Sequence, residues 1–246
     1  MKYLIAGFRF IFVLIVAITH VGGIYIVHLI GLYTVKRGFV WRASWGLNMA
    51  RAMGFRIVEK RVNHYDGPAL YVSNHRTLTD PVVQVSLFPA YIIAKDEVRK
   101  IPIIGKGAAL TGIIFVKRER LSSRGAAKIA TIDCLKDGKS VLVYPEGTTT
   151  AEKGTDQFKI GTFKSAVEAG VPVIPCAIEY RDKKDYWLEA SMSDQIIGQM
   201  GGWSTEVKVS VGKPIFGNDP KGLMETSQKL INEELARMQK GWTKVF

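Results

Sequence analysis

A long apolar stretch opens the chain. From Phe10 to Tyr33 there are 24 residues without Lys, Arg, Asp or Glu. As one helix these residues would reach about 36 Å, enough to cross a hydrocarbon core of roughly 30 Å. A glycine pair, Gly22-Gly23, lies in the middle of the stretch and permits a turn. The pattern predicts membrane attachment and leaves two forms open: one tilted transmembrane helix, or a helical hairpin dipped into one leaflet. A removable signal peptide is disfavoured because no small-residue cleavage site follows at a suitable distance.

A second helical pattern follows the apolar stretch. One stripe recurs every four residues and consists of Trp41, Trp45, Met49 and Met53. Basic residues interleave with this stripe: Lys36, Arg37, Arg42 and Arg51. A basic helix with tryptophans on its apolar side is typical of a membrane interface, where cations meet lipid phosphates. The alternative is an ordinary amphipathic helix that packs on the core. If the first segment spans the membrane, the excess of basic residues after it places the bulk of the chain on the cytoplasmic side.

The remaining chain alternates strand and helix patterns. We expect strands at Phe55–Val62, Ala69–Ser73, Tyr91–Ala94, Gly112–Val116, Val141–Tyr144, Val171–Tyr180 and Val207–Val211. We expect helices from Asp80-Pro81, from Ser122 or Ser123 to Lys136, at Phe163–Ala169 and at Lys221–Lys240. Strands separated by helices predict an α/β domain with a mixed, largely parallel sheet flanked by helices. We therefore divide the chain into a membrane-anchoring helical region, residues 1–54, and an α/β domain, residues 55–246.

Charge and composition narrow the possible partners. Lys and Arg total 34 against 22 Asp and Glu, a net charge of +12. The excess is concentrated in residues 36–61, with seven basic residues and one acidic, and in residues 95–128, with nine and three. A basic surface indicates an anionic partner. Nucleic acid is not expected because no recognition motif accompanies the charge. Two cysteines are too few for a disulfide framework or a structural zinc site, and the common glycine-rich nucleotide motifs are absent.

One histidine stands where catalytic groups are often found. His75 follows a predicted strand, and Asp80 lies five residues later, across a turn into a predicted helix. A carboxylate that accepts a hydrogen bond from one ring nitrogen fixes the tautomer of a histidine and stabilises its protonated form. The pair is therefore a candidate general base. A metal site is not expected, because His75 and Asp80 have no further histidine at useful spacing.

Three further motifs follow His75 and Asp80 in order. These are Gly112-x-x-Phe115-x-x-Arg118, then Tyr144-Pro145-Glu146-Gly147-Thr148, then Val171-Pro172-Val173-Ile174-Pro175. Together with Asn74-His75-x4-Asp80, they make the chain resemble the glycerolipid acyltransferase family, whose best-known members are 1-acylglycerol-3-phosphate, or lysophosphatidic acid, acyltransferases. The resemblance covers roughly residues 70–180. It agrees with the membrane attachment that the apolar stretch predicts.

The resemblance implies an enzyme that moves an acyl chain from a thioester to the hydroxyl of a lysolipid. In that case His75 is the general base and Asp80 orients it, and no covalent intermediate or cofactor is needed. The resemblance assigns substrate binding to Lys95, Arg118, Glu146, Gly147 and Thr148, with Arg118 on the acceptor phosphate. The expected partners are a lysolipid acceptor, a membrane and an acyl thioester of either CoA or acyl carrier protein, and the sequence does not distinguish these two donors.

One position departs from the family pattern and concerns the acceptor. In the family, the motif that ends here in Gly147-Thr148 usually continues with Arg, but this chain has Thr149 at that position. Its loss leaves Lys95 and Arg118 to bind a phosphate, or indicates a different headgroup. The strongly basic 95–128 region favours lysophosphatidic acid as the acceptor. Another lysophospholipid or a lyso-aminolipid is the alternative, and a non-catalytic membrane-lipid-binding protein is a more distant one.

Overall fold

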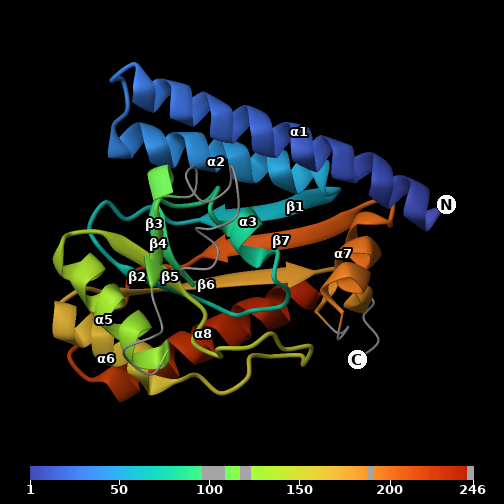
Figure 1. Cartoon of the computed structure of the whole chain (residues 1–246). Helices are drawn as coiled ribbons and strands as arrows, with labels where there is room; N and C mark the ends of the chain where they lie inside the picture. Colours follow the sequence, from blue (N-terminus) through green and yellow to red (C-terminus); the bar gives the residue numbers. More distant parts are fainter. Residues whose placement is uncertain (96–108, 117–122, 188–190, 243–246) are drawn as a thin grey trace.

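The computed structural model describes residues 1–95, 109–116, 123–187 and 191–242. Within them a seven-stranded sheet lies between helices (Figure 1). The strands are β1 (Phe55–Val62), β2 (Leu70–Ser73), β3 (Ala90–Lys95), β4 (Ile113–Val116), β5 (Ser140–Val143), β6 (Val173–Tyr180) and β7 (Thr205–Val211). The helices are α1 (Lys2–Leu29), α2 (Val35–Ala52), α3 (Asp80–Gln84), α5 (Ser123–Lys136), α6 (Ile160–Ala169), α7 (Met192–Met200) and α8 (Pro220–Gln239), with a 3-10 turn at Lys183–Asp185.

The sheet is mixed and mostly parallel, as the sequence predicts. Its strand order is β1-β7-β6-β2-β5-β3-β4. The run from β6 to β4 is parallel throughout, whereas β7 is antiparallel to β6 and parallel to β1. All carboxyl ends of the parallel run therefore lie on one edge. In open α/β sheets this is the edge where ligands bind.

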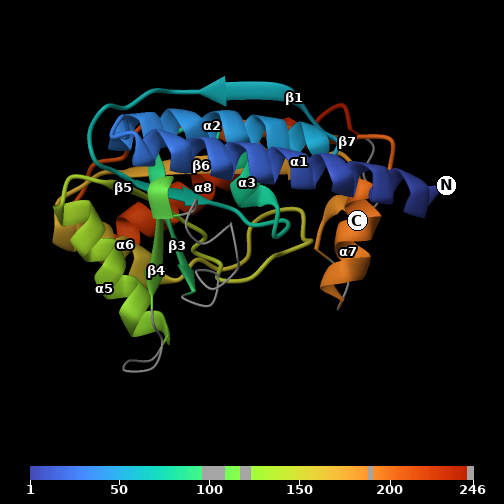
Figure 2. The same ribbon diagram turned by 45° about the horizontal axis from the view of Figure 1, so that its top comes forward.

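Two hydrophobic cores fill the space on either side of the sheet. On one face α5, α6 and α8 pack together, and their core includes Leu135, Phe163 and Ile231. On the other face α2, α3 and α7 contribute Met49, Val83 and Met200 to a core with β1, β6 and β7. Figure 2 shows α1 and α2 lying side by side on this second face. The predicted boundary at residue 54 stays a prediction.

The first two helices form a hairpin, but its turn is not at the glycine pair. Helix α1 runs unbroken through Gly22-Gly23, and the chain reverses after Leu29. An ideal Cβ on Gly23 would lie 2.5 Å from the ring of Trp41. The Trp41 indole also donates a 2.8 Å hydrogen bond to the carbonyl of His20. Gly23 therefore admits the tryptophan of α2 rather than breaking α1, and of the two forms left open, the hairpin with its turn at this pair was wrong.

The tryptophan and methionine stripe faces the protein. Met49 and Met53 are buried in the core, and Trp45 packs against it. Arg42 is also buried, and its guanidinium donates a 2.6 Å hydrogen bond to the carbonyl of Ala90. The interfacial interpretation was wrong for this stripe and for Arg42, and the amphipathic alternative is confirmed. The period of four residues is the same in both cases, so the sequence pattern did not distinguish them.

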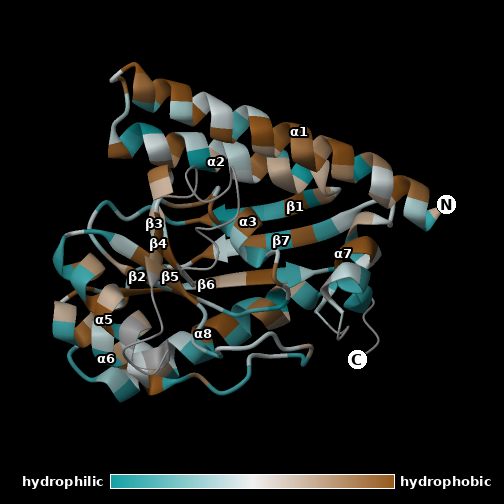
Figure 3. Cartoon of the chain, in the orientation of Figure 1, coloured by the Kyte–Doolittle hydropathy of each residue, from teal (hydrophilic) through white to brown (hydrophobic). Residues whose placement is uncertain are grey.

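The outer side of α1 is exposed and apolar, as the brown ribbon in Figure 3 shows. Helix α1 is long enough to span a membrane, and its most apolar 18-residue stretch has a mean hydropathy of 2.5. Only 6% of that stretch is buried within the protein. The polar groups of α1 have partners: His20 Nδ1 contacts the Val16 carbonyl at 2.9 Å, and Nε2 contacts Asn48 at 3.3 Å. Arg9 donates hydrogen bonds to the carbonyls of Met200, Gly202 and Trp203. These bonds attach the first third of α1 to the end of α7.

The sequence did not predict α7, which packs on the second face beside a buried carboxylate. Asp185 is 1% exposed and its Oδ1 accepts a 3.0 Å hydrogen bond from Thr205, while Oδ2 has no hydrogen-bond partner among the described residues. Burial raises the pKa of Asp185 to about 6.

A raised carboxyl pKa makes the folded state bind more protons than the unfolded state, so ionisation of Asp185 destabilises the fold. We expect the free energy of unfolding to fall as the pH rises from about 4 to about 6, by up to roughly 3 kcal/mol. Asp185→Asn should remove this dependence in denaturant titrations at pH 4, 5, 6 and 7. Equal slopes for both proteins would contradict the assignment.

Candidate active site

The site lies at the carboxyl edge of the parallel strands. β2 leads directly into Asn74 and His75, and β5 leads into the segment Tyr144–Thr150. Asn74 is buried, and its side-chain amide donates to the carbonyl of Ile178 and accepts from its amide, both at 2.9 Å. These two bonds continue the pairing of β2 with β6 beyond the end of β2, with the Asn74 side chain in place of the backbone. It fixes the point at which the backbone turns toward His75.

His75 and Asp80 meet as the sequence predicts. His75 Nδ1 lies 2.8 Å from Asp80 Oδ2. An ionised carboxylate only accepts hydrogen bonds, so Nδ1 carries the proton and the lone pair of Nε2 is available as a base. The His75 side chain is 13% exposed, whereas Asp80 is completely buried. The imidazole is therefore accessible while its orienting carboxylate is shielded from water.

Four groups donate hydrogen bonds to the Asp80 carboxylate, including His75 Nδ1. Oδ2 also accepts from the backbone amides of Arg76 at 2.6 Å and Thr77 at 3.0 Å. Oδ1 accepts a 2.7 Å bond from the hydroxyl of Tyr180. These donors stabilise the ionised form of a carboxylate that burial alone would disfavour. The expected start of the helix is nearly correct: α3 begins at Asp80, with Thr79 as N-cap and Pro81 in the first turn.

An aromatic ring covers one face of the His75 imidazole. The ring of Tyr144 stacks on it with centroids 4.1 Å apart and planes 22° from parallel. The Tyr144 hydroxyl donates a 2.7 Å bond to Gln84, whose amide donates a 2.6 Å bond to Ser73. Both of these partners are buried. The chain fixes the plane of the stacking ring, and the ring in turn limits rotation of His75.

Glu146 joins the two segments of the site. It is 3% exposed, and its Oε1 accepts from the backbone amide of His75 at 2.8 Å. Oε2 accepts from the amide of Asp156 at 2.7 Å. Burial raises the pKa of Glu146, and the hydrogen bonds from these two amides oppose the increase. Both oxygens are thus engaged by backbone, which makes Glu146 a positioning group for His75, and its role in substrate binding stays a prediction.

The other predicted binding residues are placed only in part. Gly147 is exposed with φ of 75°, a conformation that favours glycine, and Thr148 beside it is exposed. Lys95 is the last residue of β3, on the same edge, but its side chain is outside the described part of the structure. Arg118 lies outside the described residues. Among the described residues, no group of three or more His, Cys, Asp or Glu side chains is arranged to hold a metal ion.

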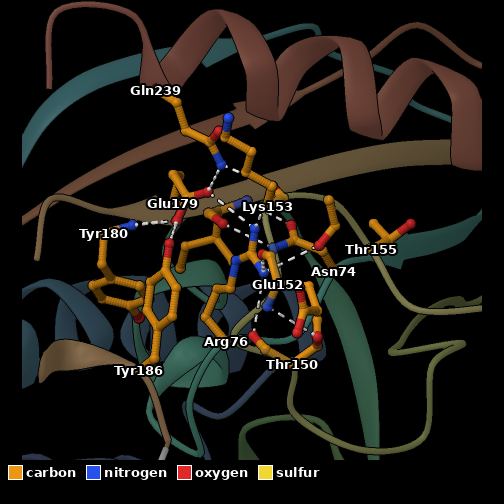
Figure 4. A network of polar contacts seen from close by, with 12 residues as sticks. Asn74, Arg76, Thr150, Glu152, Lys153, Thr155, Glu179, Tyr180, Tyr186 and Gln239 are labelled. Atoms are coloured by element: carbon orange, nitrogen blue, oxygen red, sulfur yellow. Dashed lines mark hydrogen bonds and ion pairs between the residues drawn. The ribbon is translucent and has the colours of Figure 1, made fainter. Parts of the chain in front are cut away.

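A buried arginine that the sequence analysis missed lies between the two catalytic candidates in sequence. Arg76 is fully buried, and its guanidinium stacks over Tyr186. Nη1 donates to the carbonyls of Thr150, Glu152 and Gly154 at 3.2, 2.6 and 3.1 Å, and Nη2 donates to that of Lys153 at 3.1 Å (Figure 4). The Arg76 side chain thus holds the backbone of residues 150–154 in place, just after the motif that ends at Thr148.

A buried carboxylate balances the charge of Arg76. Glu179 Oε2 lies 3.0 Å from Nη2, and both side chains are completely buried. Glu179 also accepts bonds from the Tyr186 hydroxyl, the Tyr180 amide and the Gln239 side chain. Figure 4 shows these groups converging from the β2 loop, the end of β6 and the end of α8. No local sequence signal identifies such a pair, because its members are 103 residues apart.

Comparison with known proteins agrees with this geometry. A family model described as Acyltransferase matches residues 55–179. The chain is 30% identical over 171 residues to a chloroplastic 1-acyl-sn-glycerol-3-phosphate acyltransferase of Brassica napus, covering 69% of this chain and 47% of that protein. It is 38% identical over 114 residues to the lyso-ornithine lipid O-acyltransferase of Pseudomonas aeruginosa, covering 46% and 44%. The chain therefore spans about half the length of these relatives.

A solved structure has the same fold over the whole chain. It is the crystal structure of the 1-acyl-sn-glycerophosphate acyltransferase PlsC from Thermotoga maritima. The TM-score is 0.71 at 20% sequence identity, and the alignment covers 99% of this chain and 100% of that one. The likeness therefore includes the helical hairpin as well as the α/β domain.

Proposed function

This chain belongs to the acyltransferase family, and we propose that it transfers a fatty acyl chain from an acyl thioester to the free hydroxyl of lysophosphatidic acid, giving phosphatidic acid. The observation that carries the proposal is the 2.8 Å bond between His75 Nδ1 and the buried Asp80. It leaves Nε2 as an accessible base on the edge of the sheet where ligands bind. The similar enzyme of Brassica napus is named for the same acceptor.

The proposed chemistry needs one proton carrier. His75 Nε2 takes the hydroxyl proton as the acceptor oxygen attacks the thioester carbonyl carbon, and a tetrahedral intermediate forms. Its collapse breaks the carbon–sulfur bond, and the protonated imidazole returns the proton to the departing thiolate. Asp80 stabilises the imidazolium between these two steps. The amides of His75, Arg76 and Thr77 already bind carboxylates, so the donors for the oxyanion come from other groups.

A lyso-aminolipid is the alternative acceptor, and the assay should include it. Thr149 carries no charge, and the relative from Pseudomonas aeruginosa acts by name on a lyso-ornithine lipid. The purified protein should be assayed in detergent with acyl-CoA and acyl carrier protein thioesters against lysophosphatidic acid, lyso-ornithine lipid and lysophosphatidylcholine. We expect the highest kcat/KM with lysophosphatidic acid. If another lysolipid is preferred tenfold, that lysolipid is the acceptor in place of lysophosphatidic acid. If no acyl chain is transferred to any of the three lysolipids, a lipid-binding protein is favoured over an enzyme.

We further propose that the hairpin attaches the protein to the membrane, with the α/β domain on the cytoplasmic side. The exposed apolar side of α1 supports this, as do the exposed basic residues Lys36 and Arg51 of α2. The bonds from Arg9 to the end of α7 favour a hairpin embedded in one leaflet over a helix that leaves the domain to cross the bilayer.

Basic residues on α2 should contribute to this attachment through anionic lipid. Each cation near an anionic surface is worth about 1 kcal/mol, so Lys36→Gln/Arg51→Gln should bind vesicles containing anionic lipid about 30-fold more weakly at low salt. The difference should shrink at high salt and vanish with neutral vesicles. Lys221→Gln/Lys229→Gln, which changes the same charge on α8, is the control. Equal loss in both variants would show that α2 does not face the lipid.

A further inference from the structure

A lysine lies across the exposed turn of the candidate site. The methylene groups of Lys159 pass over Gly147: an ideal Cβ on this glycine would lie 3.3 Å from Lys159 Cε and 3.5 Å from Cδ, and would collide with the ammonium itself. Gly147 therefore has two reasons to lack a side chain, its φ of 75° and the lysine above it. Lys159 is not among the residues to which the sequence assigned a role.

The backbone holds Lys159 in this place. Its amide donates a 2.9 Å bond to the carbonyl of Pro145. The next residue along the turn, Glu146, binds the amide of His75 through its carboxylate. Only the residues Pro145, Glu146 and Gly147 thus separate the ammonium from the backbone of the proposed base. A substrate group bound at Nζ would therefore lie over the turn that is hydrogen-bonded to the proposed base.

The charge at Lys159 is not used within the fold. The side chain is exposed, and no carboxylate lies within ion-pair distance of it among the residues that the structure describes. Lys159 is also the N-cap of α6, where a cation opposes the helix dipole. The fold therefore gains no stability from this charge. Residues 144–150 contain no basic residue, and in the described part of the structure the ammonium of Lys159 places a positive charge over this turn.

We propose that Lys159 binds the phosphate of the acceptor and thereby selects a lysolipid that carries a phosphomonoester. The inference rests on the proposed acyl transfer to lysophosphatidic acid and assigns the specificity of that same site. An ammonium is a compact point charge with three donors, and it suits the terminal oxygens of a phosphate. A headgroup esterified to the phosphate removes one negative charge and one free oxygen, which weakens this contact.

The test compares two methionine variants that remove the same charge from one segment. Lys159→Met should raise KM for lysophosphatidic acid about 10- to 100-fold, as expected for the loss of a charged hydrogen bond. Lys164→Met changes an exposed lysine on α6 and should leave KM unchanged. Lys159→Arg should retain most of the affinity. With lysophosphatidylcholine, Lys159→Met and wild type should differ by less than threefold, so that the loss follows the phosphomonoester.

Thr149→Arg added to Lys159→Met should recover part of the lost affinity, because it returns a cation to the same turn. An unchanged KM for lysophosphatidic acid in Lys159→Met would overturn the proposal. A rise confined to KM of the thioester would assign the ammonium to the phosphates of the donor and would also overturn it. Wild-type inactivity toward lysophosphatidic acid would instead contradict the proposed function, which the wild-type assay measures separately.

Discussion

Replacing His75 with alanine should lower kcat/KM for acyl transfer by about 10²- to 10⁴-fold, the usual contribution of a positioned general base. The protein should remain folded, because the imidazole makes one side-chain hydrogen bond and one ring contact in the described structure. The loss should appear in kcat more than in KM, because proton transfer occurs in the transition state. Initial rates with varied acceptor concentration give both constants.

The matched control for this variant is His64→Ala. His64 is exposed in the turn between β1 and β2, so its removal should leave both kcat and KM unchanged. The unfolding curve of His64→Ala should agree with that of wild type within about 0.5 kcal/mol, as expected for a surface change. His75→Ala should lose about 0.5–1.5 kcal/mol with its hydrogen bond to Asp80 and remain folded. A folded His75→Ala variant with wild-type turnover would contradict the mechanism. Equal losses in both variants would indicate damage that is unrelated to the base.

Asp80→Asn tests the carboxylate that orients His75, and the structure indicates that this change also lowers the stability of the fold. Asp80 Oδ2 accepts from the amides of Arg76 and Thr77 as well as from His75. The Asn oxygen can take the place of Oδ2, with its NH₂ facing the Tyr180 hydroxyl, but a neutral amide oxygen accepts these three hydrogen bonds more weakly than an ionised carboxylate does. We therefore expect this variant to lose both activity and stability, and to lose more stability than His75→Ala, which removes only one of the hydrogen bonds to Asp80. The sequence predicted the orienting role but gave no sign of the structural one.

The elements that the sequence predicted share a local cause. Strands and helices of the α/β domain follow from periodicity and from turn residues such as Gly138 and Gly170, which both have positive φ in the structure. The contact between His75 and Asp80 was also accessible, because both residues lie on one short turn. Where residues close in sequence determine the result, the sequence is a sufficient guide.

The elements that it missed depend on partners far along the chain. Gly23 looks like a helix breaker until Trp41 of α2 fills the space that its missing side chain leaves. Helix α7 is only nine residues long, and the contacts that fix it include the bond from Gln199 to Thr77, 122 residues away. Lys159 and Arg76 have no local signature for the same reason. Their positions follow from the sheet order, which brings β2, β5 and β6 together.

Loss of the buried arginine should have the largest effect on stability. Arg76→Met should lower the free energy of unfolding by about 3–5 kcal/mol, because it removes the cation that balances the buried Glu179 carboxylate. The carbonyls of residues 150–154 also lose their donor. Since residue 150 is also hydrogen-bonded to the carbonyl of His75, displacement of this segment should lower kcat as well. Denaturant unfolding monitored by tryptophan fluorescence, together with the transfer assay, measures both effects.

A second arginine pair isolates the contribution of burial. Arg181 contacts Glu206 at 3.0 Å, the same distance that separates Arg76 from Glu179, but the Arg181 side chain is 54% exposed. Arg181→Met should cost only about 0–1 kcal/mol, as is usual for surface ion pairs, and Glu206 also has Arg56 as a partner. Glu179→Gln in the Arg76→Met background should recover part of the lost stability by removing the stranded charge. If Arg76→Met were as mild as Arg181→Met, the guanidinium would not be what holds the 150–154 segment against the site.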